Sequence, residues 1–264
     1  MNLLNKTMDR DDLDLLECKA IIRELEDLMR FFAKFRLRKI KYSSWYGSLG
    51  KKYIPLAEQN KGSKYQPYPN AYDDKKIPWY LYWEIAWSFI HSGVKHGEVV
   101  LDAGGSSSLF SFYLASKGCK VYTVDLNSAL VKNSNYVGKR MGWPIQSSEQ
   151  NMKDLNYSDN FFDHIFSICV MEHLEREDRI QSMKQFERVL SPGGRISLTF
   201  DYLNPDPSMT INSPKDVYDQ FVSPTKLQIV GNPEFIDNGK RYLREIYRPE
   251  RGLEYTFGSL FLIK

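Results

Sequence analysis

The chain has 264 residues, and its 42% apolar and 26% charged content is that of an ordinary globular protein with a substantial core. The formal net charge of +3 is too mild to indicate a nucleic-acid-binding protein by itself. Three cysteines, Cys18, Cys119 and Cys169, are scattered without CxxC spacing. This pattern predicts a chain without a disulfide framework and without a metal site, in a reducing compartment.

Residues 1–42 are charged and carry apolar side chains at helical spacing, which predicts an amphipathic helix. The start of the chain has no signal-peptide pattern, and no apolar run approaches the roughly 18 residues of a membrane span. We therefore expect a cytoplasmic protein without a membrane span. The apolar stripe of the helix consists of Leu13, Leu16, Ala20, Ile21, Leu25 and Leu28.

A basic run closes this zone of the chain. Such a run is typical of a solvated helix face, but it could also hold a phosphate or an RNA backbone. Both interpretations stay open from the sequence. The cations of the run are Lys34, Arg36, Arg38, Lys39 and Lys41.

Residues 43–92 are rich in aromatic residues and turn formers, and their tail from Trp79 to His91 has helical spacing. From residue 97 onward strand and helix signals alternate, as in a parallel α/β sheet. Helices are expected at 107–117 and 174–190, whereas 201–253 has no clear assignment. The predicted strands are Glu98–Asp102, Lys120–Asp125, Trp143–Gln146, Asp163–Ser167, Arg195–Phe200 and Glu254–Ile263.

The first predicted strand ends in an acid, Asp102, and runs into a turn of small residues that opens a helix. Small side chains let the backbone approach a ligand closely, and the helix N-terminus offers unpaired N–H groups. The second strand ends in Asp125, where a carboxylate can accept hydrogen bonds from both ribose hydroxyls of an adenosine. The two signals together predict a site for an adenosine-containing ligand.

The glycine spacing argues against a nicotinamide cofactor. A dinucleotide fingerprint has glycines at its first, third and sixth positions. Counted from Gly104, these positions are Gly104, Ser106 and Leu109. The fingerprint also makes no use of an acid at the end of the first strand, which this chain has.

About residues 95–200 and the terminal strand resemble the class I S-adenosylmethionine-dependent methyltransferases, in particular the methyltransferase-11-type branch. The first motif of that family, acid-x-Gly-x-Gly-x-Gly, aligns with Asp102, Gly104, Ser106 and Ser108, so serine replaces two glycines and one glycine is displaced to Gly105. Because Gly104 keeps its family position, substitution at Gly105 is expected to be the milder of the two. Later landmarks align with the segments 151–163, 170–174 and 188–194.

The resemblance implies a Rossmann-like, mostly parallel seven-stranded sheet flanked by helices, with S-adenosylmethionine as cofactor. Residues 93–264 would form this domain, and residues 1–92 a helical, aromatic-rich extension that serves as a substrate or lid region. Asp102 would face the cofactor's ammonium group, Asp125 its ribose, and Asn151 its adenine. The cofactor-binding residues implied are Asp102, Ala103, Gly104, Gly105, Ser106, Asp125, Leu126, Asn151, Met152 and Cys169.

Two assignments keep alternatives. His173 follows the fourth strand near the expected methyl position and is a candidate general base, whereas the resemblance favours a role at a helix start. Aromatic rings before the first strand could face the cofactor's sulfonium by cation–π attraction, or could be core packing. These aromatic and flanking residues are Pro78, Trp79, Tyr80, Tyr82, Trp83 and Trp87.

The expected activity is methyl transfer to an oxygen, nitrogen or carbon atom of a small molecule or a glycan intermediate. An RNA or protein methyltransferase is the first alternative, favoured by the basic run, although nucleic acid is the less expected partner. A non-catalytic cofactor-binding protein is the second, favoured by the altered glycine motif. The sequence predicts neither the substrate nor the oligomeric state.

Overall fold

The computed structural model describes residues 3–34, 79–203, 211–243 and 254–264. Its centre is a mixed sheet with the strand order β3-β2-β1-β4-β5-β8-β6, and β7 pairs with β8 beside this path. The first five strands run parallel, and β8 is antiparallel to β5. The strands are β1 Val99–Ala103, β2 Lys120–Asp125, β3 Ile145–Glu149, β4 Phe162–Ile168, β5 Leu190–Tyr202, β6 Gln228–Ile229, β7 Tyr242–Leu243 and β8 Glu254–Ile263.

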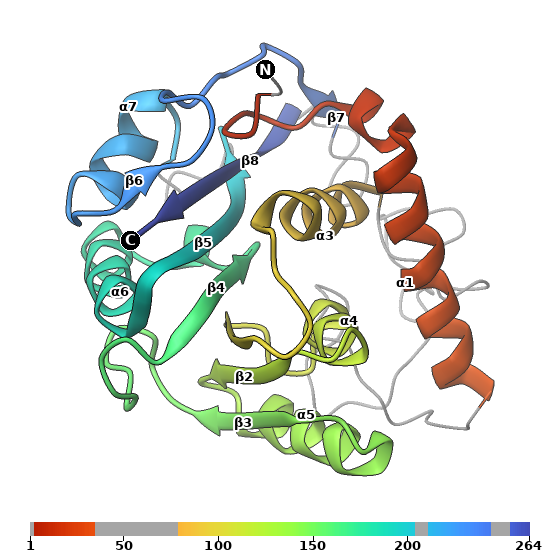
Figure 1. Cartoon of the computed structure of the whole chain (residues 1–264). Coiled ribbons are helices and arrows are strands. Elements are labelled where there is room, and N and C mark those ends of the chain that lie inside the picture. The colour runs from red at the N-terminus through yellow and green to blue at the C-terminus, as the bar shows by residue number, and fades with distance from the viewer. Residues whose placement is uncertain (1–2, 35–78, 204–210, 244–253) are drawn as a thin grey trace, which may run out of the picture.

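Helices cover both faces of the sheet (Figure 1). Side chains of β1 alternate between two hydrophobic cores, with Val100 in one and Leu101 in the other. The first core is closed by α1, α3 and α4, and the second by α6 and the short helices after β5. The helices are α1 Leu16–Lys34, α3 Trp79–Ser92, α4 Leu109–Ser116, α5 Ser128–Met141, α6 Arg176–Val189 and α7 Pro214–Val217, with single turns η1 Arg10–Asp14, η2 Met171–His173 and η3 Tyr218–Val222.

The strand order reverses at β1, which has β2 on one side and β4 on the other. In open α/β sheets, ligands bind outside the carboxyl ends of the strands at such a reversal. The predicted Rossmann-like, mostly parallel sheet with flanking helices is confirmed. The fold therefore places the ends of β1, β2 and β4 around one crevice.

The buried face of α1 differs in part from the predicted stripe. Ile21, Leu25 and Leu28 are buried as expected, but Leu16 is 81% exposed and Ala20 is also exposed. At about 100° per residue, those two positions lie about 100° or more around the helix from Ile21. The side chains that extend the buried face are Cys18, Met29 and Phe32.

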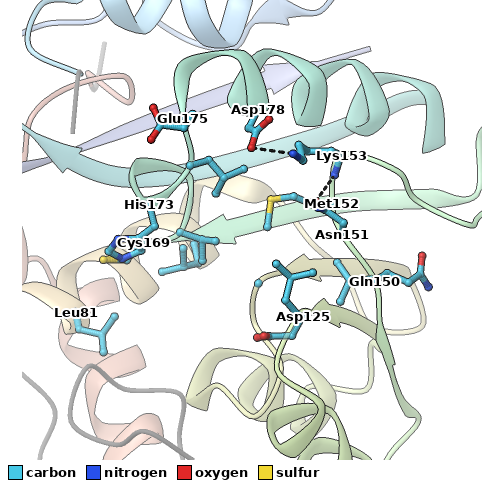
Figure 2. A pocket seen from close by; sticks show the side chains of 16 residues that line it. Leu81, Asp125, Gln150, Asn151, Met152, Lys153, Cys169, His173, Glu175 and Asp178 are labelled. Carbon is cyan, nitrogen blue, oxygen red and sulfur yellow. Dashed lines mark hydrogen bonds and ion pairs between the residues drawn. The ribbon is translucent and has the colours of Figure 1, made fainter. Parts of the chain in front are cut away.

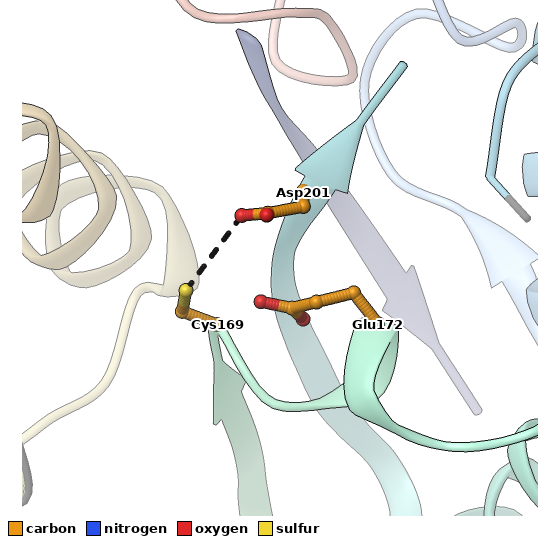
Figure 3. Close-up of side chains that lie close together, drawn as sticks. All are labelled: Cys169, Glu172 and Asp201. Carbon is orange, nitrogen blue, oxygen red and sulfur yellow. Dashed lines mark hydrogen bonds between the residues drawn. The ribbon is translucent and has the colours of Figure 1, made fainter. Parts of the chain in front are cut away.

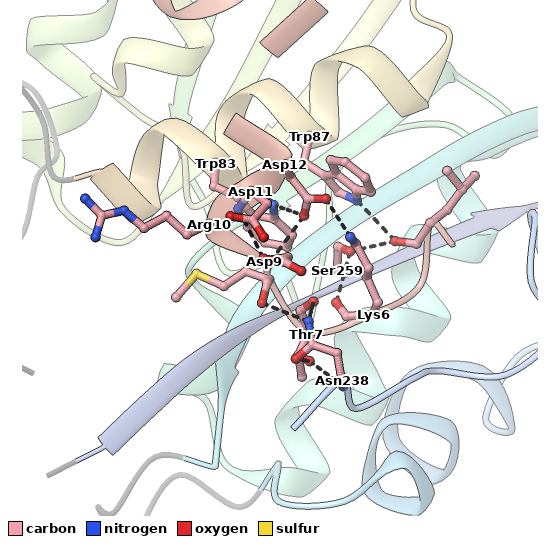
Figure 4. A network of polar contacts seen from close by, with 12 residues as sticks. Lys6, Thr7, Asp9, Arg10, Asp11, Asp12, Trp83, Trp87, Asn238 and Ser259 are labelled. Carbon is pink, nitrogen blue, oxygen red and sulfur yellow. Dashed lines mark hydrogen bonds and ion pairs between the residues drawn. The ribbon is translucent and has the colours of Figure 1, made fainter. Parts of the chain in front are cut away.

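The first residues of the chain are bound to its last strand and to the loop before it (Figure 4). The Thr7 backbone N–H donates to the Ile236 carbonyl (2.9 Å), and the Met8 N–H donates to the Phe257 carbonyl (2.8 Å). Lys6 Nζ lies 2.7 Å from a carboxylate oxygen of Asp12 in η1. The described residues on both sides of residue 92 thus share one core, and the division into 1–92 and 93–264 stays a prediction.

No helix in the described ranges is both long and apolar enough to cross a membrane.

Candidate functional site

A cavity of about 780 Å³ opens at the carboxyl ends of β1, β2 and β4 (Figure 2). This volume lies within the range of sites for small molecules and cofactors. Of the sequence-predicted site residues, seven line the cavity and four do not. Those that line it are Gly104, Asp125, Leu126, Asn151, Met152, Cys169 and His173, and those that do not are Asp102, Ala103, Gly105 and Ser106.

Gly104 makes the turn from β1 towards α4. Its φ is +78°, in the left-handed region that favours glycine, and its N–H donates to the Val124 carbonyl at 2.8 Å. A Cβ at Gly104 would lie 2.5 Å from Cγ1 of Val170, which also lines the cavity. Both the backbone angle and the space therefore require glycine at this position.

Gly105 is at least as restricted as Gly104. A Cβ there would lie 2.0 Å from Cγ and Oδ2 of Asp102, whose side chain occupies the space beside it. The fold therefore gives no reason to expect Gly105 to tolerate a side chain better, whereas the effect of either substitution on cofactor binding stays a prediction. The sequence motif could not reveal this contact, because the packing of Asp102 against the turn is set by the folded loop.

Asp102 lies beneath the turn and is only 1% exposed. Its Oδ2 accepts hydrogen bonds from the Ser111 hydroxyl (2.6 Å) and the Ser108 hydroxyl (3.0 Å). Ser108 also caps α4, because its oxygen accepts from the Ser111 backbone N–H at 2.9 Å. Burial raises the pKa of Asp102 to about 6, and the two serine hydroxyls oppose the rise. The carboxylate thus joins β1, the turn and the start of α4.

Ser106 replaces a family glycine without reaching the cavity. Its hydroxyl lies 2.9 Å from that of Thr123 in β2 and 2.8 Å from that of Ser147 in β3. The Thr123 and Ser147 hydroxyls are themselves 2.7 Å apart. The three buried hydroxyls satisfy one another under the loop, which explains how a side chain is accommodated there.

Asp125 ends β2 and is half-buried at the cavity wall. Its Oδ1 accepts a hydrogen bond from the Asn127 backbone N–H at 2.8 Å. Burial raises the pKa of this carboxyl group, and the backbone N–H groups of Asn127 and Leu126 oppose the rise. An oriented carboxylate with a raised pKa at a strand end is suited to bind a ligand hydroxyl.

The segment after β3 forms a second wall. The side-chain oxygen of Asn151 accepts from the Lys153 backbone N–H at 3.1 Å, which closes a tight turn. Lys153 Nζ lies 2.8 Å from Asp178 Oδ2, so an ion pair connects this turn to α6 (Figure 2). Met152, between the two, also lines the cavity.

Cys169 follows β4 in the left-handed region, with φ of +55°. A non-glycine residue in this conformation is strained and occurs preferentially at functional sites. Its N–H is held by β5, 3.1 Å from the Thr199 carbonyl and 3.2 Å from the Thr199 hydroxyl. His173 lies close by, with a side chain that is 56% exposed and Nε2 3.9 Å from Oε1 of Glu172.

The aromatic rings of α3 belong to the core and do not line the cavity. Tyr80 stacks on Phe257, with ring centroids 4.9 Å apart, and Trp83 stacks on Trp87 at 5.8 Å. From this helix only Leu81 lines the cavity. Core packing is thus the observed role of these rings. Pro78 and the basic residues Arg36, Arg38, Lys39 and Lys41 lie outside the described residues.

Several cavity residues were not among the predicted site residues. Most are apolar or lie at or just before the start of α6, and their types alone do not distinguish a cavity wall from ordinary surface. Lys153, Val170 and Leu174 lie in the segments 151–163 and 170–174 that align with family landmarks, which was the available hint. The residues missed are Leu81, Val124, Gln150, Lys153, Ile168, Val170, Leu174, Glu175 and Asp178.

Comparison with known proteins agrees with a ligand cavity at the ends of β1, β2 and β4. Residues 101–198 match the family model of the methyltransferase domain of methyltransferase-11 type. This segment is a methyltransferase domain, similar to those of the class I S-adenosylmethionine-dependent methyltransferases. The matched segment runs from within β1 to within β5 and contains β2, β3 and β4 whole, and thus most of the described cavity wall.

Among its relatives is the ubiquinone/menaquinone biosynthesis C-methyltransferase UbiE of Hahella chejuensis, with 29% identity over 163 residues. The match covers 60% of this chain and 62% of that protein.

Solved structures share the methyltransferase fold. The cyclase SpnF has a TM-score of 0.58 at 12% identity, over 72% of this chain and 83% of that one. The geranyl diphosphate C-methyltransferase of Streptomyces coelicolor has a TM-score of 0.51 at 15% identity, over 68% and 77% of the two chains.

The cavity fits the cofactor of this family, S-adenosylmethionine. Its volume suffices, the Gly104 turn lets a ligand approach the backbone, and Asp125 offers a carboxylate at the end of β2. Among the described lining residues, the carboxylates of Asp125, Glu175 and Asp178 also outnumber the single lysine, Lys153. Such a lining favours a ligand with positive charge.

Proposed function

We propose that the protein transfers a methyl group from S-adenosylmethionine to a small molecule or a glycan intermediate. The observation that carries the proposal is Asp125 at the end of β2, facing the same cavity as the Gly104 turn and the Asn151–Met152 segment. These three elements come from separate parts of the chain, and each fits one part of an adenosine-containing ligand. The acceptor atom, whether oxygen, nitrogen or carbon, is left open.

In this proposal Asp125 accepts hydrogen bonds from the ribose hydroxyls, and its bond from the Asn127 N–H fixes the carboxylate in position. Gly104 gives the methionine portion access to backbone groups. Asn151 and Met152 contact the adenine edge and face. Asp102 does not contact the cofactor in this proposal but holds the Gly104 turn in position, since its carboxylate accepts hydrogen bonds from Ser108 and Ser111 beneath the cavity wall.

Bound S-adenosylmethionine supplies an activated methyl group on a positively charged sulfur. The protein then has to align the acceptor with the methyl group. When the reacting atoms are held about 3 Å apart and in line, the loss of translational and rotational entropy has already occurred on binding, and the barrier is lower. Cys169 and His173 lie at the wall opposite the Asp125 end (Figure 2). We assign His173 as the candidate group that accepts a proton from the acceptor, since its imidazole is exposed to the cavity.

Two features support a small acceptor. The relative from Hahella chejuensis and the Streptomyces coelicolor enzyme carry names of small-molecule C-methyltransferases. The acidic lining of the cavity repels a polyanion, which disfavours RNA as the acceptor. A protein acceptor has no specific support among the described residues.

Calorimetry with S-adenosylmethionine, its demethylated product and NAD tests the cofactor assignment. We expect binding of the first two and none of NAD. Binding of NAD without a response to the methyl donor would overturn the proposal.

The activity is tested by incubating the enzyme with labelled donor and a metabolite extract, and the expected result is label in a small product. His173→Gln should lower kcat while leaving the affinity for the cofactor unchanged. Cofactor binding without any labelled product would favour the alternative of a non-catalytic cofactor-binding protein. A parallel incubation with total RNA and with cell protein tests the other alternative, which label in either would favour.

A further inference from the structure

Behind the cavity wall, three potential ligand side chains converge from three elements (Figure 3). Cys169 follows β4, Glu172 belongs to η2, and Asp201 lies in β5. One atom from each, the thiol sulfur and two carboxylate oxygens, lies within 4.8 Å of the others. Cys169 Sγ and Asp201 Oδ1 are 4.0 Å apart.

A further carboxylate, Glu84 of α3, faces this cluster and is fully buried. Its charge interacts with those of Glu172 and Asp201. Within the described part of the chain, neither oxygen of Glu84 and neither oxygen of Glu172 makes a hydrogen bond of ordinary geometry, although the Thr199 side chain lies near Glu84 and the Cys169 thiol near Glu172. Buried carboxylates without such partners are costly and require a compensating charge or proton.

The positive charge nearby balances only part of this cluster. Buried Arg179 of α6 interacts electrostatically with Glu172, and His173 Nε2 lies 3.9 Å from the same carboxylate. Three carboxylates and a thiol therefore share one buried region with a single permanent cation among the described neighbours. The arrangement has the donors and the charge deficit of a cation site.

We propose that Cys169, Glu172 and Asp201 bind one divalent transition-metal ion, with the third carboxylate, Glu84, as a fourth donor in or next to its coordination shell. A thiol among carboxylates selects a borderline metal such as Zn²⁺ or Co²⁺ over Mg²⁺. In a tetrahedral zinc site, neighbouring sulfur and oxygen ligands are about 3.5 Å apart. The observed sulfur–oxygen separation of 4.0 Å needs only a small contraction.

This site departs from the sequence analysis, which predicted no metal from cysteine spacing. Spacing along the chain finds zinc sites made of cysteines and histidines, whereas these donors come from positions 84, 169, 172 and 201. Because Cys169 lines the cavity, the ion would hold an oxygen of the methyl acceptor on that side. That last role rests on the proposed function, but the metal site itself does not.

The test uses the purified full chain, stripped of metal with a chelator and titrated with Co²⁺ alone. We expect one equivalent to bind and to give the near-ultraviolet band of a cobalt–thiolate bond. Cys169→Ser should remove the band, and Asp201→Asn should weaken binding at least tenfold. The stripped protein, incubated with Zn²⁺ and freed of excess metal, should contain about one zinc ion per chain by mass spectrometry.

Two controls match these changes. Cys119→Ser alters another buried cysteine outside the cluster, and Asp178→Asn alters another cavity carboxylate, so both should keep the band and the affinity. Circular dichroism checks that each variant is folded. If the folded wild type binds no Co²⁺ or Zn²⁺ at millimolar concentration, or if Cys119→Ser removes the band, the site is refuted whatever the cofactor titration shows.

Discussion

At the scale of single residues, the carboxylates around the β1 turn have separate tasks. Asp102 is buried beneath the loop and bonded to two serine hydroxyls, whereas Asp125 faces the cavity. The sequence predicted both as strand-end acids, and their positions at the ends of β1 and β2 agree with that. It could not predict that the side chain of one points into the loop and that of the other into the cavity.

Asp125→Ala should weaken the affinity for S-adenosylmethionine by about 1.5–3 kcal/mol, the range for hydrogen bonds to a charged group. Folding should change little, because Asp125 is half-buried at a strand end. Calorimetry measures the affinity, and urea unfolding measures the stability. Asp154→Ala, at an exposed acid outside the cavity, serves as the control and should bind normally. An unchanged dissociation constant for Asp125→Ala would place the ribose elsewhere.

Gly104→Ala should destabilise the fold more than Gly142→Ala. Both glycines have positive φ, so each substitution costs roughly 1–2 kcal/mol of backbone strain. At Gly142 a Cβ meets open space, whereas at Gly104 it meets Val170 at 2.5 Å. Urea unfolding gives the difference, and adding Val170→Ala should recover part of the loss at Gly104. If both substitutions lowered the free energy of unfolding equally, the contact with Val170 would not account for the effect at Gly104.

Asp102 makes stability depend on pH with a definite sign. Its pKa is about 6 in the folded chain, above the ordinary 3.8, so the folded chain binds this proton more tightly than the unfolded chain does. The resulting gain in the free energy of unfolding is fully present below pH 3.8 and is lost as pH rises through 6. At 1.36 kcal/mol per pH unit, the loss is about 3 kcal/mol at most. Asp102→Asn should therefore gain stability relative to wild type between pH 4.5 and 8 in urea unfolding. If the free energies of unfolding of Asp102→Asn and wild type differed by the same amount at every pH, this prediction would be contradicted.

At the scale of elements, the strands were the most predictable part of the fold. Lys120–Asp125 and Glu254–Ile263 match β2 and β8, because apolar and β-branched residues mark buried strands. The third strand was displaced, from Trp143–Gln146 to Ile145–Glu149, since β3 is short and polar. Helix α5 had no prediction, and its mixed polar sequence is stabilised by tertiary contacts with β3.

Helix α3 is held by polar contacts that its apolar sequence did not suggest. The Trp83 indole N–H donates to Asp12 Oδ2 at 2.8 Å, and the Trp87 indole N–H donates to the Leu4 carbonyl at 3.2 Å. Aromatic spacing predicted the helix but not these partners, which lie about 70 or more residues earlier in the chain.

Trp83→Phe should lower the free energy of unfolding by about 1.5–3 kcal/mol, because Asp12 loses a hydrogen bond donor in a buried setting. The affinity for S-adenosylmethionine should stay the same, since neither residue lines the cavity. Urea unfolding and calorimetry give the two values. Trp143→Phe, at a partly buried indole, provides the comparison and should cost less. If Trp83→Phe weakened cofactor binding as strongly as stability, the ring would have a role at the site.

At the scale of the whole molecule, the crevice at the strand reversal was predictable in position but not in detail. The order of motifs along the chain indicated the sheet and the cofactor end of the cavity, including Gly104 and Asp125. The end of the cavity that we propose for the acceptor is lined by residues of α6, by the end of β4 and by Leu81 of α3. Leu81 and Asp178 meet the end of β4 only in the folded chain, so no spacing in the sequence marks them.

The junction between residues 4–8 and β8 bears on how the protein is made. The Ser259 hydroxyl donates to the Leu4 carbonyl at 2.7 Å across 255 positions of sequence, and Met8 is bound to Phe257. During synthesis, residues 4–8 therefore have these partners only after β8 has emerged from the ribosome. Closing so long a loop is slow, so these contacts should form late in folding.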